Sequence, residues 1–135
     1  CDTEVVVDGA ALGKPADAAE ARLMLLDLSG RAHEVHSALV VMGAGDRREC
    51  LAVTRVHMRT IPDPMLDWYI GTGEWRDRAG GYAIQGAGAA LVERVEGDYT
   101  AVVGLPLAAL VDALAAAGVA PWDDAARDGA RGQAQ

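Results

Sequence analysis

Two charged side chains near the start of this 135-residue chain are of the types that act on phosphates. Asp2 precedes a short apolar run, residues 5–7, and Lys14 follows an Asp-Gly dipeptide at residues 8–9. Asp-Gly between two apolar runs predicts a two-residue β-hairpin turn, because both turn positions require positive φ. A turn centred there brings Asp2 and Lys14 to the same open end of the hairpin, about one diagonal step apart. Such a pair can serve metal-dependent phosphate chemistry, or it can be an ordinary surface ion pair.

The register of this hairpin sets which residues face each other. Val7 should face Ala10 and, counting outward, Thr3 should face Lys14. Strict alternation puts Asp2 and Lys14 on opposite faces, so their convergence requires the strand ends to splay or twist. Lys14 is the one lysine in a chain whose other basic residues are arginines, which favours a position that needs a compact point charge.

The glycines before Lys14 resemble a P-loop only superficially. Three residues separate Gly9 from Gly13 where the motif has four, and Pro15 stands where a Mg²⁺-binding Ser or Thr is required. We therefore reject a Walker-type ATPase.

The composition limits the class of protein. The length suits one domain with a real core, built on Val, Leu and Ala because the chain has no Phe. The net charge of −8 argues against a nucleic-acid surface. No apolar run reaches the ~18 residues of a membrane span. Two cysteines, Cys1 and Cys50, give no disulfide framework, so we expect a cytoplasmic protein.

The hydrophobic pattern predicts an α/β protein. Helices are expected at 17–28, 63–70 and 106–117, the first capped by Asp17 with a stripe of Ala21, Met24, Leu25 and Leu28. Strands are expected at 33–42, 50–59 and 89–95, with a short extended piece at 82–85 and turns at 43–48 and 97–98. This order is not a regular βαβ alternation, so a mixed β-sheet flanked by helices is the predicted architecture. Residues 119–135 lack an apolar period and are expected to form a disordered tail.

Five short segments carry a resemblance to a known family. They are DTEVV at residues 2–6, LGKP at 12–15, LSGRAHEVH at 28–36, AGGYAIQG at 79–86 and VGLP at 103–106. In their order and intervals they resemble the Maf, or septum-formation-inhibitor-type, nucleoside triphosphate pyrophosphatases. Family members carry roughly a third more chain upstream, opening with Ser-x-Ser-Pro-Arg-Arg. The resemblance therefore predicts that residues 1–118 are the C-terminal two-thirds of such a domain, N-terminally truncated.

The resemblance implies a fold and an activity. The fold is an elongated, inosine-triphosphatase-like mixed sheet flanked by helices, with the nucleotide in a cleft between two lobes. The activity is hydrolysis of dTTP, UTP or modified pyrimidine nucleotides to the monophosphate and pyrophosphate, with Mg²⁺ or Mn²⁺ as cofactor. The expected partner is the nucleoside triphosphate, with no nucleic acid or membrane, and the family usually forms homodimers.

The resemblance also assigns roles to single residues. Asp2 is the essential acidic residue, which takes a proton from the attacking water or holds the cation. Lys14 contacts phosphate, and Thr3 occupies the position for base selection. Asp77 lies in the acidic-basic-Ala-Gly run beside the cleft, where a solvated loop ion pair is the alternative.

Gln85 is the residue most informative about the base. Its amide presents one acceptor and one donor side by side, which complements N3–H and O4 of uracil or thymine. By the resemblance, relatives that prefer 7-methylguanine nucleotides differ here, with an acidic residue. The alternative is a loop glutamine that bonds backbone groups.

Other functions stay open at this point. The absence of the upstream motif allows a non-catalytic nucleotide-binding remnant or a regulatory protein, and a 7-methyl-GTP-preferring pyrophosphatase is a further alternative. His33 and His36, three apart on an expected strand, face opposite sides and suit packing better than metal binding.

Overall fold

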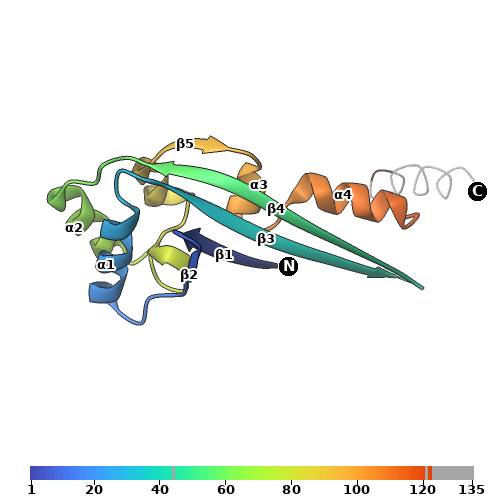
Figure 1. Ribbon diagram of the computed structural model, residues 1–135, viewed down its shortest axis with the longest axis horizontal. Coiled ribbons are helices and arrows are strands. Elements are labelled where there is room, and N and C mark those ends of the chain that lie inside the picture. The colour runs from blue at the N-terminus through green and yellow to red at the C-terminus, as the bar shows by residue number, and fades with distance from the viewer. Residues whose placement is uncertain (44, 121, 123–135) are drawn as a thin grey trace, which may run out of the picture.

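The computed structural model describes residues 1–43, 45–120 and 122 (Figure 1). The strands are β1 (Asp2–Val7), β2 (Ala10–Leu12), β3 (Ala32–Gly43), β4 (Asp46–Met58) and β5 (Val92–Glu96). The helices are α1 (Ala18–Leu28), α2 (Asp63–Thr72), α3 (Tyr99–Val103) and α4 (Leu107–Ala116), with two short 3-10 segments, η1 (Ala79–Gly81) and η2 (Gly86–Leu91). Most of the predicted tail, residues 121 and 123–135, lies outside the described residues.

The five strands form one sheet in the order β2-β1-β3-β4-β5. The α/β class with a sheet flanked by helices is confirmed. All four strand pairings among the described residues are antiparallel, rather than the mixture of directions that the sequence suggested. The connections β1–β2 and β3–β4 are hairpins, which make the strands antiparallel. The two longer connections do not join parallel neighbours: the one through α1 joins β2 to β3, which are not adjacent, and the one through α2 joins β4 to β5, which run antiparallel.

The first hairpin is confirmed at its turn. Asp8 and Gly9 have φ of 50° and 77°, the positive values that the two turn positions require, and Val7 pairs with Ala10. The β1–β2 ladder ends at Val5 and Leu12, so Thr3 and Lys14 are not paired in it. Thr3 is instead paired with Ser37 of β3.

The core lies on one face of the sheet. It contains Val5, Val7, Val35, Val56 and Met58 from the strands and residues of α1, α2 and the segment between α2 and β5, namely Ala21, Leu25, Leu28, Ile61, Leu66, Tyr69, Trp75, Tyr82, Ile84 and Leu91. Side chains that alternate with the strand residues point to the other face, which the described residues leave open. In Figure 1 the β3–β4 hairpin extends well beyond the helical layer, with α4 beside it.

Two of the expected helices begin close to where the sequence placed them, and the first is capped as predicted. The Asp17 side chain accepts a hydrogen bond from the Glu20 amide at 2.8 Å, which caps α1, and Ala21 beyond it is fully buried. Helix α2 begins at Asp63, with Pro62 as its N-cap and no side-chain hydrogen bond at that cap.

Two local predictions are wrong in their bounds. The strand expected at 89–95 is a 3-10 segment up to Leu91, and only Val92–Glu96 is extended. The turn expected at 43–48 is narrower, since β3 ends at Gly43 and β4 begins at Asp46.

The turn expected at 97–98 is present, with Gly97 at a φ of 127°, and it leads into α3, where the Asp98 carboxylate accepts from the amides of Thr100 and Ala101 and so caps the helix. Among the described residues, no helix is long and apolar enough to cross a membrane.

Candidate functional site

One cavity gathers all five residues that the sequence singled out. Its volume is about 260 Å³, just below the range of small-molecule pockets. Asp2, Thr3, Lys14, Asp77 and Gln85 all line it. The other lining residues are Cys1, Val5, Val35, Arg78, Ala79, Tyr82, Ala83, Ile84, Val102, Val103 and Gly104.

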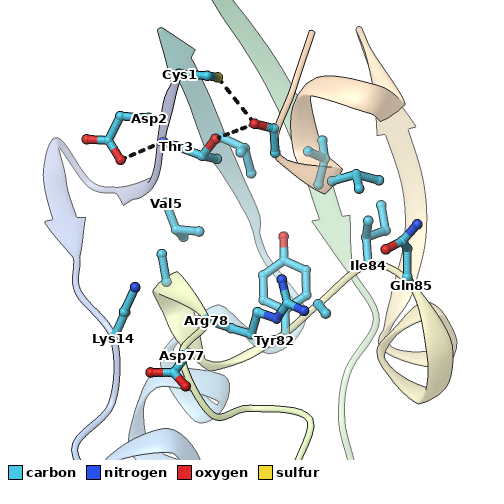
Figure 2. A pocket seen from close by; sticks show the side chains of 16 residues that line it. Cys1, Asp2, Thr3, Val5, Lys14, Asp77, Arg78, Tyr82, Ile84 and Gln85 are labelled. Atoms are coloured by element: carbon cyan, nitrogen blue, oxygen red, sulfur yellow. Dashed lines mark hydrogen bonds between the residues drawn. The ribbon is translucent and has the colours of Figure 1, made fainter. Parts of the chain in front are cut away.

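The two walls of the cavity come from distant parts of the chain (Figure 2). Asp2 and Lys14 lie on the side of the first hairpin, and Ile84 and Gln85 lie on the opposite side. Tyr82 stands between them, at the floor. The sheet positions one wall and the segment between α2 and β5 positions the other.

Asp2 and Lys14 do not pair with each other. One Asp2 carboxylate oxygen accepts from the Thr3 amide at 3.0 Å, and neither residue forms an ion pair within the described part of the chain. The Gly80 amide donates to the Gly13 carbonyl at 3.0 Å, which ties the backbone next to Lys14 to η1. The surface ion pair that spacing alone allowed is therefore not found.

The Thr3 hydroxyl has a fixed polarity. Ser37, fully buried, donates its hydroxyl proton to the Ala101 carbonyl at 2.7 Å. The proton in the 2.8 Å contact between Thr3 Oγ1 and Ser37 Oγ then comes from Thr3, whose hydroxyl also lies 3.4 Å from a second acceptor, the Gly104 carbonyl oxygen. Because both of these acceptors belong to the protein, Thr3 Oγ1 presents a lone pair to the cavity as an acceptor.

A strained turn brings two more charges to the cavity. Asp77 has φ of 58°, a left-handed conformation that is uncommon outside glycine and enriched at functional sites. It takes part in no ion pair among the described residues, so the solvated loop pair is not found either. Its neighbour Arg78 also lines the cavity and was missed as a site residue. The signal was its position between Asp77 and two glycines that force a tight turn.

The floor of the cavity rests on a buried polar pair. Tyr82 Oη lies 2.7 Å from His33 Nε2, and both residues are buried. Burial, with a smaller contribution from His57, lowers the pKa of His33 to about 4, and burial raises the pKa of Tyr82. Both groups are neutral near pH 7. His33 is buried as expected, and its Nδ1 has no hydrogen-bond partner among the described residues.

The described residues supply few ligands for a metal ion. They contain no group of three or more His, Cys, Asp or Glu side chains placed to hold one. Mg²⁺ is commonly held by one or two carboxylates, with substrate phosphates and water completing its shell. Two exposed carboxylates line the cavity, Asp2 and Asp77, which fits that mode of binding and no all-protein metal cage.

The fold and the cavity define an α/β protein whose site suits a phosphorylated ligand with a polar ring. Two cations, Lys14 and Arg78, can meet phosphate charge, while Thr3 and Gln85 offer hydrogen bonds of the kind that read a base. The family model of the Maf-like proteins matches residues 1–117, and the chain belongs to this family.

Several curated relatives, all named dTTP/UTP pyrophosphatases, match most of the chain. It is 49% identical over 110 residues to a dTTP/UTP pyrophosphatase of Pyrococcus furiosus, covering 82% of this chain and 58% of that protein. The dTTP/UTP pyrophosphatase of Bordetella parapertussis is 48% identical, with 88% and 58% covered. That of Anaeromyxobacter dehalogenans is 47% identical, with 90% and 66% covered. The chain thus spans about three-fifths of the length of these relatives.

Proposed function

We propose that this chain carries the base-reading and catalytic side chains of a nucleoside triphosphate pyrophosphatase that acts on dTTP and UTP. The observation that carries the proposal is the convergence of Asp2, Thr3, Lys14, Asp77 and Gln85 on one cavity. The names of the relatives, which are dTTP/UTP pyrophosphatases, support the same substrate class.

The reaction would be attack of water on the α-phosphorus. The new P–O bond forms as the bond from the α-phosphorus to the bridging oxygen breaks, and pyrophosphate leaves with that oxygen. Asp2 would orient the water or accept its proton, and Lys14 with Arg78 would offset the charge that builds on the departing pyrophosphate. Neither role needs a covalent intermediate.

A divalent cation, Mg²⁺ or Mn²⁺, would be held by Asp2 together with the phosphates of the substrate. When bound, the cation supplies further charge neutralisation on the phosphates. Lys14 and Arg78 supply two positive charges, whereas a triphosphate carries about four negative charges. A bound divalent cation would offset the remainder.

Base selection would fall to Gln85 and Thr3. The Gln85 amide can pair with N3–H and O4 of uracil or thymine, and Thr3 contributes an acceptor of fixed polarity. We further propose that the protein acts in the cytoplasm, because Cys1 and Cys50 are both free thiols and a reducing compartment keeps thiols free. A homodimer rests on the family resemblance alone, and sedimentation of the purified protein would test it.

The test is pyrophosphate release from dTTP, UTP, dATP and dGTP with Mn²⁺. We expect turnover of dTTP and UTP above the purines, and a loss of roughly 100-fold in kcat/KM for Lys14→Ala. Arg47→Ala, at the exposed tip of the β3–β4 hairpin, removes a charge far from the cavity and should leave kcat/KM unchanged. Binding of dTTP without any pyrophosphate release would favour a nucleotide-binding protein instead.

A further inference from the structure

The segment that presents Gln85 has no strand ladder to hold it. Gln85 is exposed, and it lies between the 3-10 segments η1 and η2 rather than in a strand. Its side chain forms no hydrogen bond within the described part of the chain, and it gives η2 no side-chain cap. Something outside the segment must fix the backbone if the amide is to face the cavity in one direction.

Glu74, in the turn after α2, supplies that anchor. Its Oε1 accepts from the Ala87 amide at 3.2 Å and its Oε2 accepts from the Gly88 amide at 3.3 Å. Both carboxylate oxygens therefore hold backbone groups two and three residues after Gln85. The carboxylate also takes the position at the start of η2 where free amides would otherwise lack partners.

The packing around Glu74 leaves little room for another arrangement. Gly86 has φ of +63°, and a Cβ there would lie 2.7 Å from Glu74 Oε1. A Cβ on Gly88 would lie 1.8 Å from the Ala83 carbonyl oxygen, so the segment closes tightly on itself. The Ala83 amide donates to the Tyr69 hydroxyl at 3.2 Å, which fixes the other end of the segment to α2.

We propose that Glu74 is a positioning residue for base selection: it holds the backbone on which Gln85 reaches the nucleotide. The inference rests on the proposed function, since it takes Gln85 to read the base. Glu74 lines a second hollow, which also contains Gln85 and Arg78, and not the cavity that holds Asp2 and Lys14. In the proposed role, its effect on the base passes through Gln85, and the variants below test this.

The test compares Glu74→Ala and Glu74→Gln with Asp17→Ala in the full chain. Asp17 is a carboxylate cap on α1 and does not line the cavity, so its loss matches the structural cost without touching Gln85. The readout is the ratio of the dissociation constants for dGTP and dTTP, measured by calorimetry, alongside the melting temperature of each variant.

We expect Glu74→Ala to lower this selectivity roughly tenfold, the effect of one or two misplaced hydrogen bonds. Glu74→Gln, which keeps one acceptor, should lower it less. Asp17→Ala should lower the melting temperature with unchanged selectivity. In a Gln85→Ala background the effect of Glu74→Ala on selectivity should disappear.

Three results would overturn the inference. They are wild-type selectivity in Glu74→Ala, a loss of selectivity that persists without Gln85, and a matching loss in Asp17→Ala. Equal affinity of the wild-type chain for dTTP and dGTP would refute both base selection by Gln85 and the positioning role of Glu74. Selective binding without pyrophosphate release would instead reject only the hydrolytic activity.

Discussion

The two ends of the β3–β4 hairpin share one strand pattern but differ in what covers them. At the site end, residues 32–37 and 52–58, every second side chain is buried against helices and Tyr82, and His33, Val35 and Val56 are at most 3% exposed. At the tip end, residues 38–43 and 46–51, the open face leaves Val40, Met42 and Leu51 exposed by 44%, 75% and 61%.

This difference shows that the alternation of side chains along a strand decides which face of the sheet each one is on, but does not by itself bury that face. Burial requires a second layer, and at the site end that layer also builds the cavity, since Tyr82 and Ile84 belong both to the core and to its lining. At the tip end the described residues place α4 beside one face and nothing over the other, and this open face continues into the site end, where Val53 is 48% exposed. Perturbations on the covered face of the site end should therefore change stability and binding together, whereas those on the open face of the tip end should change neither.

The largest expected effect is the loss of stability on acidification, which His33 at the site end should cause. The folded state lowers the pKa of His33 from 6.5 to about 4, so neutral His33 contributes stability above pH 6.5 that is lost as the pH falls toward 4. The wild-type free energy of unfolding should fall by roughly 3 kcal/mol over this window from His33 alone. Urea unfolding at pH 7.5 and pH 4 measures it, with His33→Gln expected to lose less stability.

Val40→Ala is the control from the tip end, since it removes no titratable group. It should follow the wild-type pH dependence. An equal loss of stability on acidification in wild type and His33→Gln would show that burial at the site end does not hold His33 neutral.

The next largest effect is expected from comparing two alanine substitutions on β3, one at a buried and one at an exposed position. Val35→Ala should lower the free energy of unfolding by roughly 2 kcal/mol, because Val35 is 2% exposed and leaves a cavity in the core. Val40→Ala should cost less than about 0.5 kcal/mol, because its side chain already meets solvent. Denaturant titration of both variants gives the comparison. Similar losses would mean that the open face is covered in solution.

The sequence was sufficient for the local features of this fold. The Asp8-Gly9 turn, the Asp17 cap and the long strand at 33–42 depend on nearby residues and formed as predicted. The apolar pattern of that strand could not show that one of its faces stays open, because that depends on which elements lie across the sheet.

The site was predictable in part through the family motifs. Those motifs pointed to Asp2, Thr3, Lys14, Asp77 and Gln85, which line one cavity. Arg78 and Glu74 were missed because each depends on a tertiary contact: Arg78 reaches the cavity from a strained turn, and Glu74 bonds amides thirteen and fourteen residues away. Helix α3 was missed for a similar reason, since five residues are too few for a periodic signal.

The smallest effect distinguishes two buried hydroxyls at the site end. Ser37 and Thr54 are both fully buried and both donate to a carbonyl in or just before α3, Ser37 to Ala101 at 2.7 Å and Thr54 to Asp98 at 3.2 Å. Ser37→Ala and Thr54→Val should each cost about 1 kcal/mol of stability. Of these two hydroxyls, only Ser37 also accepts the Thr3 proton. Its loss leaves the Gly104 carbonyl, 3.4 Å away, as the acceptor of that proton, so the Thr3 hydroxyl turns and its lone pairs face the cavity in a new direction.

We therefore expect Ser37→Ala to weaken dTTP binding several-fold, and Thr54→Val to leave it at the wild-type value. Calorimetric titration with dTTP, at a temperature well below both unfolding transitions, keeps the two effects apart. In a Thr3→Val background Ser37→Ala should have no further effect on binding, because the hydroxyl whose direction Ser37 sets is gone. Equal weakening by both variants would place the cause in α3, which both hydroxyls anchor, and not in the direction of the Thr3 hydroxyl.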